Sequence, residues 1–268
     1  LGTIVNNGGN NMTHTVSLTG LDPATFYYVE CFSINGNDTA FSSVGLFSTA
    51  SNSTGAIRPY FNHSVDNSFS TGTDAQNITT YFNDTIKAYM DLAQTSLDIC
   101  VYNASDGTIA NAINDAYNRG VTVRYIADDD VVNSMLSNLN PNIPVVYRNS
   151  SLPGIMHNKF IVIDANIADS SWVLSGSTNW TSEQIFNDPN HIIMVQDQSV
   201  ARSYELEFNE ISSAFLLDSP MSLDGYTALS VLTKIIFFTL FFIEALMIFF
   251  VPKTLLSYKS LGRRAHSR

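Results

Sequence analysis

The sequence predicts an α/β protein whose main domain has a mixed β-sheet flanked by helices, with a small all-β remnant before it and an apolar helix after it. Three observations lead to this fold class. Apolar strand-like runs alternate with helical patterns from residue 59 to residue 218, a shorter region of strand-like alternation precedes them, and a long apolar run follows. With 268 residues, of which 45% are hydrophobic and 14% charged, the chain can bury one sizeable core and a smaller second one.

The main domain is expected to span residues 59–218, because strands and helices alternate there as they do in layered α/β domains. Strands are predicted from short β-branched and apolar runs, at Leu97–Tyr102, Val121–Ile126, Ile143–Tyr147, Lys159–Ile163, Trp172–Leu174 and Ile192–Gln196. Helices are predicted where apolar residues recur at helical spacing, at Thr73–Ala93, Ala110–Asn118, Val131–Leu139 and Val200–Phe215.

Residues 1–50 are predicted to form a small all-β region, with strands at Thr13–Leu18, Thr25–Phe32 and Ser42–Phe47. Its stretch Leu21–Tyr27 resembles the corner of fibronectin type III modules, where a tyrosine at the position of Tyr27 ties its strand to an upstream loop. Because a whole module of that kind has about 100 residues, we expect a partial accessory module without chemistry of its own. Residues 51–58, rich in Ser, Thr and Asn, are expected to be a linker.

The segment 227–251 is almost wholly apolar and long enough to cross a bilayer, which takes about 20 residues. Lys234 and Glu244 oppose this interpretation, because charges are costly at the bilayer centre. If the segment spans a membrane, the basic tail 252–268 is cytoplasmic and the main domain is extracellular or at the cell surface. A buried helix or an unrelated tail is the alternative.

The formal net charge is −11, but the charges are unevenly distributed. Residues 1–226 hold 7 basic and 23 acidic groups, a net charge of −16. A surface of that sign repels polyphosphate, which counts against a general nucleic-acid binder. The two cysteines are predicted to lie in different units, so no disulfide is expected. The chain begins at Leu1 without a recognisable signal peptide, so we expect a mature or truncated fragment.

The most informative stretch is His157-Asn-Lys159-Phe-Ile-Val-Ile-Asp164, followed twelve residues later by Gly176-Ser-Thr-Asn179. Residues two apart on a strand point to one face, so an imidazole and an ammonium would stand side by side on a rigid element. A nucleophilic nitrogen beside a fixed positive charge suits attack on a phosphodiester.

The full set of residues resembles the signature of the phospholipase D superfamily, and the resemblance covers residues 59–218. It implies that His157 is the nucleophile, forming a phosphohistidine, and that Lys159 neutralises the phosphate oxygens. It further implies that Ser177 and Asn179 bind the phosphate and that Asp164 fixes the motif through hydrogen bonds. The scheme needs no metal and no cofactor.

The sequence departs from the family pattern at two points, and each departure leads to a prediction about the site. Family members use two histidines, one to attack and one to protonate the leaving oxygen, whereas this chain has a single motif. A homodimer that joins two His157 side chains at one site is therefore predicted. A glutamate that orients the nucleophile in related sequences is also missing, and Asp188 or His191 is the candidate substitute.

The acidic run Asp128-Asp-Asp130 ends a predicted strand. Three carboxylates there could bind Mg²⁺, but a helix N-cap before Val131 is the preferred interpretation.

These observations predict a metal-independent phosphodiesterase that acts on phospholipid and is associated with a membrane through residues 227–251. An endonuclease of the same superfamily is the first alternative. A non-catalytic surface-binding protein is the second.

Overall fold

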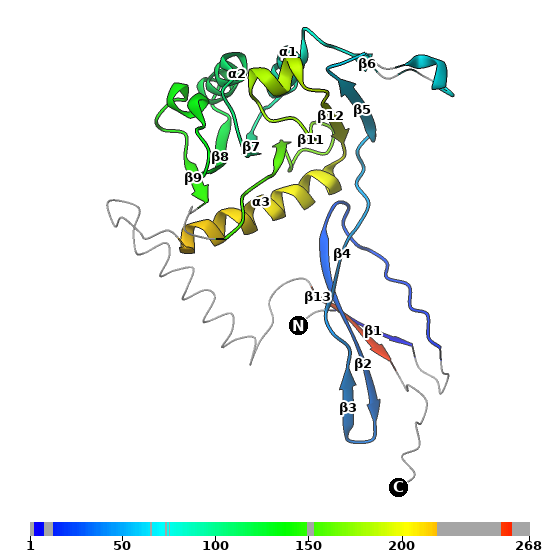
Figure 1. The fold of residues 1–268 in the computed structure, drawn as a ribbon. Coiled ribbons are helices and arrows are strands. Elements are labelled where there is room, and N and C mark those ends of the chain that lie inside the picture. The colour runs from blue at the N-terminus through cyan, green and yellow to red at the C-terminus, as the bar shows by residue number, and fades with distance from the viewer. Residues whose placement is uncertain are drawn as a thin grey trace. The chain divides into compact units, whose positions relative to one another are not determined.

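The computed structural model describes residues 3–7, 13–64, 66–72, 74, 76–148, 153–218 and 253–258. The chain divides into two compact units, one formed by residues 51–221 and the other by residues 1–50 together with 222–268. The first is the α/β unit and the second is the β unit (Figure 1).

The α/β unit is built on an eight-stranded mixed sheet with the strand order β6-β5-β12-β11-β10-β7-β8-β9. Its strands are β5 (Ala56–Phe61), β6 (Gln76–Asn77), β7 (Ser96–Val101), β8 (Thr122–Asp128), β9 (Val145–Arg148), β10 (Lys159–Ile163), β11 (Trp172–Gly176) and β12 (His191–Gln196). β7, β8 and β9 are parallel, whereas β10 runs antiparallel to both β7 and β11. The predicted mixed sheet is thus present, and the predicted strand Lys159–Ile163 coincides with β10.

Helices cover both faces of this sheet (Figure 1). On one face, α1 (Phe82–Met90) and α2 (Gly107–Asn118) pack on a core that includes Ile99, Ile161, Leu174 and Met194. On the other face, α3 (Gln198–Asp218) packs on a smaller core that includes Cys100, Phe160, Val162 and Val173. Short helical turns lie at Asn67–Phe69 (η1), Ser134–Asn138 (η2) and Glu183–Asn187 (η3).

Three elements of the α/β unit differ from the prediction. The helix expected at Thr73–Ala93 begins only at Phe82, because the Asn77 side chain accepts both the N–H and the hydroxyl of Thr79 and β6 occupies Gln76–Asn77. The helix expected at Val131–Leu139 is reduced to η2. Residues 56–58 are not linker but the start of β5, which pairs with β12 along its length.

The β unit contains β1 (Thr3–Asn7), β2 (Phe26–Asn35), β3 (Asp38–Phe41), β4 (Gly45–Ser48) and β13 (Lys253–Tyr258). Tyr27 is buried, and its hydroxyl accepts the N–H of Asp22 at 2.8 Å, which ties β2 to the loop before it. The strand predicted at Thr13–Leu18 is not formed. One edge of β2 pairs with β3 and β4 and the other with β13, so no edge of β2 is left for it.

The residues of β13 were expected to belong to a basic tail, but they pair in parallel with β1 and β2. The predicted membrane segment 227–251 lies outside the described residues. Among the residues that are described, no helix is both long enough and apolar enough to cross a membrane. Cys31 and Cys100 are both free.

Candidate active site

The predicted site lies where four neighbouring strands of the α/β unit reach the same edge of the sheet. Tyr102 follows β7, His157 precedes β10, Ser177 follows β11 and His191 begins β12. The N–H of Tyr102 donates to the carbonyl of Asn158 at 2.9 Å, and the N–H of Ser177 donates to the carbonyl of His191 at 3.2 Å. Antiparallel pairing therefore brings together side chains that are up to 89 positions apart in the sequence.

Lys159, the first residue of β10, has a buried side chain with only 7% of its surface exposed. Its ammonium donates to the carbonyl of His157 at 2.9 Å and lies 5.3 Å from the centre of the Tyr102 ring, a cation–π distance. Burial lowers the pKa of Lys159 because desolvation disfavours the charged form. The ammonium is thus held close to the backbone of His157, where little water can screen its charge.

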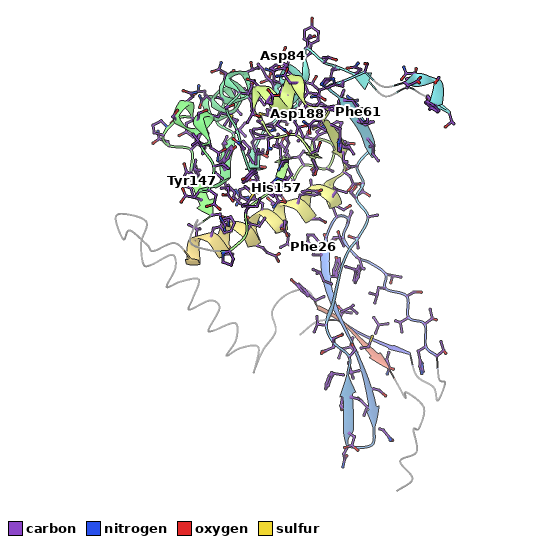
Figure 2. The ribbon with its side chains drawn as sticks, in the orientation of Figure 1. Phe26, Phe61, Asp84, Tyr147, His157 and Asp188 are labelled. Carbon is purple, nitrogen blue, oxygen red and sulfur yellow. The ribbon has the colours of Figure 1, made fainter. Side chains whose placement is uncertain are left out.

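The side chain of His157, which is labelled in Figure 2, is exposed, whereas that of Lys159 is buried. Its ring lies 5.0 Å from the Tyr102 ring, with 57° between the two planes. Tyr102 therefore contacts both residues of the motif, its ring lying beside the imidazole and near the ammonium. A nucleophile must be reachable by substrate, and His157 meets that requirement while the aromatic ring limits where it can point.

Ser177 and His191 form a polar pair at the neighbouring strand ends. The Ser177 hydroxyl donates to Asn190 Oδ1 at 2.8 Å, and its oxygen lies 3.2 Å from His191 Nδ1. Because the hydroxyl proton is directed to Asn190, the short contact with His191 is satisfied when Nδ1 carries the proton and donates to Ser177. The strand pairing of β11 with β12 thus places His191 beside a predicted phosphate ligand.

Asn179 is half-buried, and its side-chain oxygen is buried without a hydrogen-bond partner among the described residues. The backbone around it is fixed, because the N–H of Trp180 donates to the carbonyl of Asn103 at 2.9 Å. A buried amide with an unused polar atom is costly unless a ligand completes its hydrogen bonds. The atom left without a partner is an acceptor, so only the NH₂ group of the same amide can donate to a phosphate oxygen.

Asp188 lies in the loop between β11 and β12 and belongs to a different network. Its carboxylate accepts the side-chain amide of Gln184, and its backbone carbonyl accepts the amide of Asn62 at 2.7 Å. Asn62 is fully buried and also bonds the carbonyl of Ile185 at 3.0 Å and the N–H of Asn190 at 2.7 Å. Of the two candidates for the missing glutamate, the structure brings His191 to Ser177 and uses Asp188 to shape the loop.

Asp164 follows the far end of β10. It is five positions from Lys159, about 16 Å at 3.3 Å per strand residue. Its carboxylate is fully buried and accepts the N–H groups of Gln94, Thr95 and Ser96 at 2.7 to 2.9 Å, and also the Thr95 hydroxyl at 2.8 Å. Asp164 thus ties the motif strand to the start of β7 and lies at the opposite end of β10 from His157.

The acidic run Asp128–Asp130 is not the N-cap of a helix. η2 begins after Asn133, which makes no side-chain cap bond. Asp128 instead accepts the N–H of Met156, the residue before His157. In the described part of the chain, no group of three or more His, Cys, Asp or Glu side chains is arranged to hold a metal ion.

Sequence reasoning missed Tyr102 and misassigned Asp128. Tyr102 carried a weak signal, since it ends the apolar run of a strand that precedes a helix, a position where α/β domains commonly place functional side chains. A groove of about 470 Å³ also opens beside the site on the α3 side of the sheet. It is lined by Val173, Ser175, Gly176, Ser177, His191, Ile193, Val195, Val200 and Tyr204.

Comparison with known proteins identifies the region that carries this site. Residues 86–212, which include every predicted site residue, match the family described as cardiolipin synthase, PLD-like domain. This region is similar to PLD-like domains. The match agrees with the predicted resemblance to the phospholipase D superfamily.

Relatives that match this region are named mitochondrial cardiolipin hydrolase and phospholipase D. The mitochondrial cardiolipin hydrolase of Xenopus tropicalis is 33% identical over 121 residues, which cover 44% of this chain and 55% of that protein. The phospholipase D of Rickettsia conorii is 32% identical over 117 residues, 43% of this chain and 56% of that protein. The chain thus spans about half the length of the curated relatives it matches. Among solved structures, the phospholipase D family member NUC from Salmonella typhimurium aligns with a TM-score of 0.45 and 19% identity, over 58% of this chain and 93% of that chain.

Proposed function

We propose that the α/β unit is a metal-independent phosphodiesterase of the phospholipase D type. The observation that carries the proposal is an exposed imidazole, that of His157, beside a buried ammonium, that of Lys159, at the fixed end of one strand. A ring nitrogen of His157 attacks the phosphorus, the bond to the leaving oxygen breaks, and a phosphohistidine forms. Water then attacks the phosphohistidine and regenerates the imidazole.

The neighbouring side chains suit the charge that develops on the phosphoryl oxygens. Lys159 supplies a positive charge from a position shielded from water, where electrostatic stabilisation is stronger than in solution. The Asn179 side chain carries an amide NH₂ group that can donate to the phosphoryl oxygens, and the Ser177 hydroxyl lies at the same end of the sheet. Asp164 takes no part in the chemistry and keeps β10 in register.

The test is hydrolysis of bis(p-nitrophenyl) phosphate by the full chain in the presence of EDTA. Activity should persist in EDTA, and His157→Ala should abolish it. His14→Ala, which removes an imidazole from the β unit, serves as the matched control and should keep wild-type activity. Turnover that requires Mg²⁺, or that survives in His157→Ala, would contradict the mechanism. No turnover on any diester would favour a non-catalytic surface-binding protein.

A homodimer would supply the second histidine that this mechanism needs as the general acid. The groove beside Ser177 and His191 supports such a pairing, because it joins the site to an apolar face of β5 and β12. On that face Ile57 is 68% exposed, although it pairs with Val195 in the sheet. A second copy docked there would cover the apolar surface and bring two His157 side chains to one phosphate.

Val195→Asp places a charge on this face and should convert a dimer to a monomer with loss of turnover. Val132→Asp makes the same substitution at a side chain that is 86% exposed away from the groove, and should leave the dimer intact. Light scattering on both variants measures the change. An active wild-type monomer would refute the shared site.

Phospholipid is the favoured substrate. The relatives named above are a cardiolipin hydrolase and a phospholipase D, and the net charge of −16 over residues 1–226 disfavours approach by long nucleic acids. Competition between phosphatidylcholine vesicles and single-stranded DNA for turnover of the chromogenic diester distinguishes the two classes. Inhibition by DNA alone would support the endonuclease alternative.

The apolar segment 227–251 is proposed to associate the protein with a membrane and to place the α/β unit on the extracellular or cell-surface side. Protease treatment of intact cells should then remove the α/β unit while it remains membrane-bound in untreated cells. Full protection of the unit would refute this placement.

A further inference from the structure

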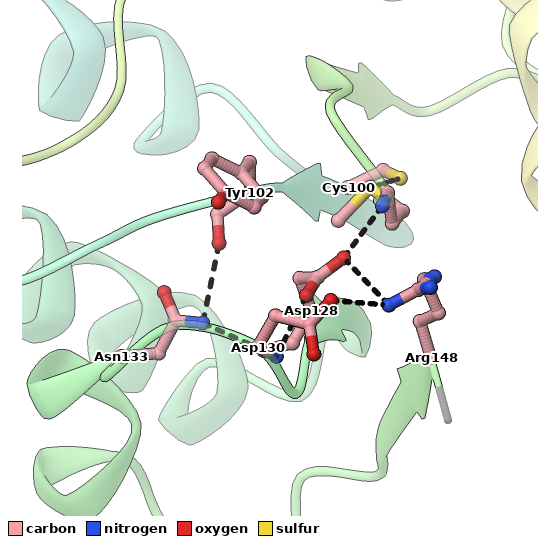
Figure 3. Close-up of polar contacts among 7 residues, drawn as sticks. Cys100, Tyr102, Asp128, Asp130, Asn133 and Arg148 are labelled. Atoms are coloured by element: carbon pink, nitrogen blue, oxygen red, sulfur yellow. Dashed lines mark hydrogen bonds and ion pairs between the residues drawn. The ribbon is translucent and has the colours of Figure 1, made fainter. Parts of the chain in front are cut away.

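A buried carboxylate accepts a hydrogen bond from the residue that precedes the proposed nucleophile. Asp128 ends β8 with 1% of its surface exposed. One of its oxygens accepts the N–H of Met156 at 2.5 Å and the other accepts the N–H of Asp130 at 2.8 Å (Figure 3). Met156 immediately precedes His157, so this carboxylate holds the peptide through which the chain enters the site.

The charge of Asp128 has a buried partner. Arg148 ends β9, opposite Asp128 in the strand register, and is 4% exposed. Its guanidinium lies 2.7 Å from Asp130 Oδ2 and 3.8 Å from Asp128 Oδ2 (Figure 3). Burying two opposite charges is costly and rarely adds net stability compared with an apolar pair. A need for a strong, fixed hydrogen-bond acceptor at Met156 explains why an ionised group stands there.

The Met156 side chain is also anchored. It is 4% exposed, lies in the core beneath α3, and contacts the Cys100 thiol at 3.4 Å. On the other side of the nucleophile, the Lys159 ammonium donates to the carbonyl of His157. The backbone of His157 is therefore held from both directions, whereas its side chain contacts the Tyr102 ring and is otherwise exposed.

We propose that Asp128 is a positioning residue for His157. Its carboxylate, held by Arg148 and by the Asp130 N–H, fixes the Met156 peptide and thereby sets the direction in which the imidazole leaves the backbone. This role rests on the proposed phosphodiesterase function. It differs from both interpretations drawn from the sequence, because the lone pairs of Asp128 are directed to backbone N–H groups and a guanidinium, not to a metal ion or a helix terminus.

Asp128→Asn tests the role, because the amide keeps the shape but loses the charge and one acceptor. The matched control is Asp98→Asn. Asp98 is also 1% exposed and also paired with an arginine, Arg124 at 2.6 Å, but it lies within β7 away from the strand ends that form the site. Both variants should lower the melting temperature.

Only Asp128→Asn should lower kcat, by about 10- to 100-fold with KM within about two-fold, because a small displacement of a reacting group costs up to about 10²-fold. Equal loss of kcat in the two variants, or no loss in Asp128→Asn, would overturn the proposal. Asp130→Asn provides a milder variant if Asp128→Asn does not fold, since it removes the 2.7 Å partner of Arg148 and leaves the bond to Met156 in place. It should reduce kcat about three-fold by loosening the same network, and unchanged kcat would count against the proposal.

Amide hydrogen exchange at Met156 gives a readout that does not depend on turnover. Exchange at this N–H should accelerate at least about ten-fold in Asp128→Asn and remain at the wild-type rate in Asp98→Asn, because only the first variant weakens its acceptor. If the wild-type protein hydrolyses no diester, the proposed function fails while this measurement still tests the positioning. Unchanged Met156 exchange in Asp128→Asn would overturn the positioning itself.

Discussion

Replacing Asp164 with asparagine should destabilise the α/β unit while leaving its chemistry nearly intact. In the folded protein one carboxylate oxygen accepts three hydrogen bonds, from the N–H and hydroxyl of Thr95 and the N–H of Ser96, and the other accepts the N–H of Gln94. The side-chain oxygen of asparagine can replace the carboxylate oxygen that accepts three bonds. The asparagine NH₂ group then faces the Gln94 N–H, and because both groups are donors no hydrogen bond forms between them. Asparagine tolerates the left-handed backbone of this residue, whose φ is 48°, so the chain path is preserved.

The magnitude follows from these contacts. Three charge-assisted bonds become neutral ones, each falling from about 1.5–3 to about 0.5–1.5 kcal/mol, and one buried donor loses its acceptor at a cost of about 1–3 kcal/mol. The substitution also removes a buried charge that has no cation beside it, and this recovers part of the lost stability. We expect a net loss of about 3 kcal/mol, or a fall of about 1.5 M in the urea midpoint for a slope near 2 kcal/mol per molar. Asp164→Ala should lose more, because it removes all four bonds and strains the backbone by about 1 kcal/mol.

Tryptophan fluorescence during urea unfolding measures this loss without interference from the β unit. Both tryptophans of the chain, Trp172 and Trp180, are buried in the α/β unit. Below the transition, kcat of Asp164→Asn should stay within about three-fold of wild type, since a substitution at the far end of a rigid strand moves His157 little. A normal midpoint with lost activity would show that the carboxylate acts in the chemistry and would refute the structural role.

Substitutions at three other residues test other parts of the site. Lys159→Met should abolish turnover and unfold at a urea concentration equal to or above wild type, because it removes a buried ammonium. In the wild type, kcat should decrease at alkaline pH with a midpoint below 10.5, the ordinary pKa of lysine, because burial lowers the pKa of Lys159. A decrease in kcat with its midpoint at or above pH 10.5 would contradict this. Gly176→Ala should cost about 1–3 kcal/mol or more, because its Cβ would collide with the carbonyl oxygen of His191, and an unchanged urea midpoint would refute the close strand approach. Tyr102→Phe should keep the wild-type kcat, whereas Tyr102→Leu should lower kcat about ten-fold, as expected for a ring contact worth about 1–2 kcal/mol. Equal kcat in the two variants would show that the aromatic ring does not contribute to turnover.

The burial of Lys159 also sets the sign of a pH effect on stability. The folded-state pKa lies below that of the unfolded chain, so between the two values the unfolded chain binds more protons. Stability from this residue therefore increases as the pH rises through the folded pKa, and the charged ammonium is a cost at neutral pH. That cost is consistent with a side chain retained for chemistry and not for folding.

Much of the α/β unit could be predicted because its strands are short apolar runs whose pattern does not depend on distant contacts. β10 and β12 show this, with boundaries within one residue of those expected. The predicted start of the helix that became α1 failed because a side chain of Asn77 competes for the backbone, an effect that hydrophobic periodicity does not register. The assignment of residues 56–58 to a linker failed because β5, which lies next to the edge strand β6 and exposes three of its six residues, lacks a continuous apolar run.

Some residues of the candidate site could likewise be predicted from the sequence, and others could not. His157, Lys159, Ser177 and Asn179 could be selected because the motif is local in sequence. Asp188 and His191 could not be ranked until strand pairing placed His191 opposite Ser177. The predicted anchor at 227–251 lies outside the described residues and remains a prediction.

Asp128 and Asp164 together show what sequence spacing leaves out. Each is a buried carboxylate that accepts backbone N–H groups, and they act at opposite ends of the motif strand, Asp128 through Met156 and Asp164 through the residues that begin β7. Asp164 is part of the motif and was selected, whereas Asp128 is 28 residues from its partner and looked like a helix cap. In the proposed mechanism, a strand held at both ends by charge-assisted bonds keeps His157 and Lys159 in place before substrate arrives, so that little reorganisation is needed during the reaction. Combining Asp128→Asn with Asp164→Asn should therefore give stability losses that add, because the sites are far apart, while the loss of kcat should come from Asp128 alone.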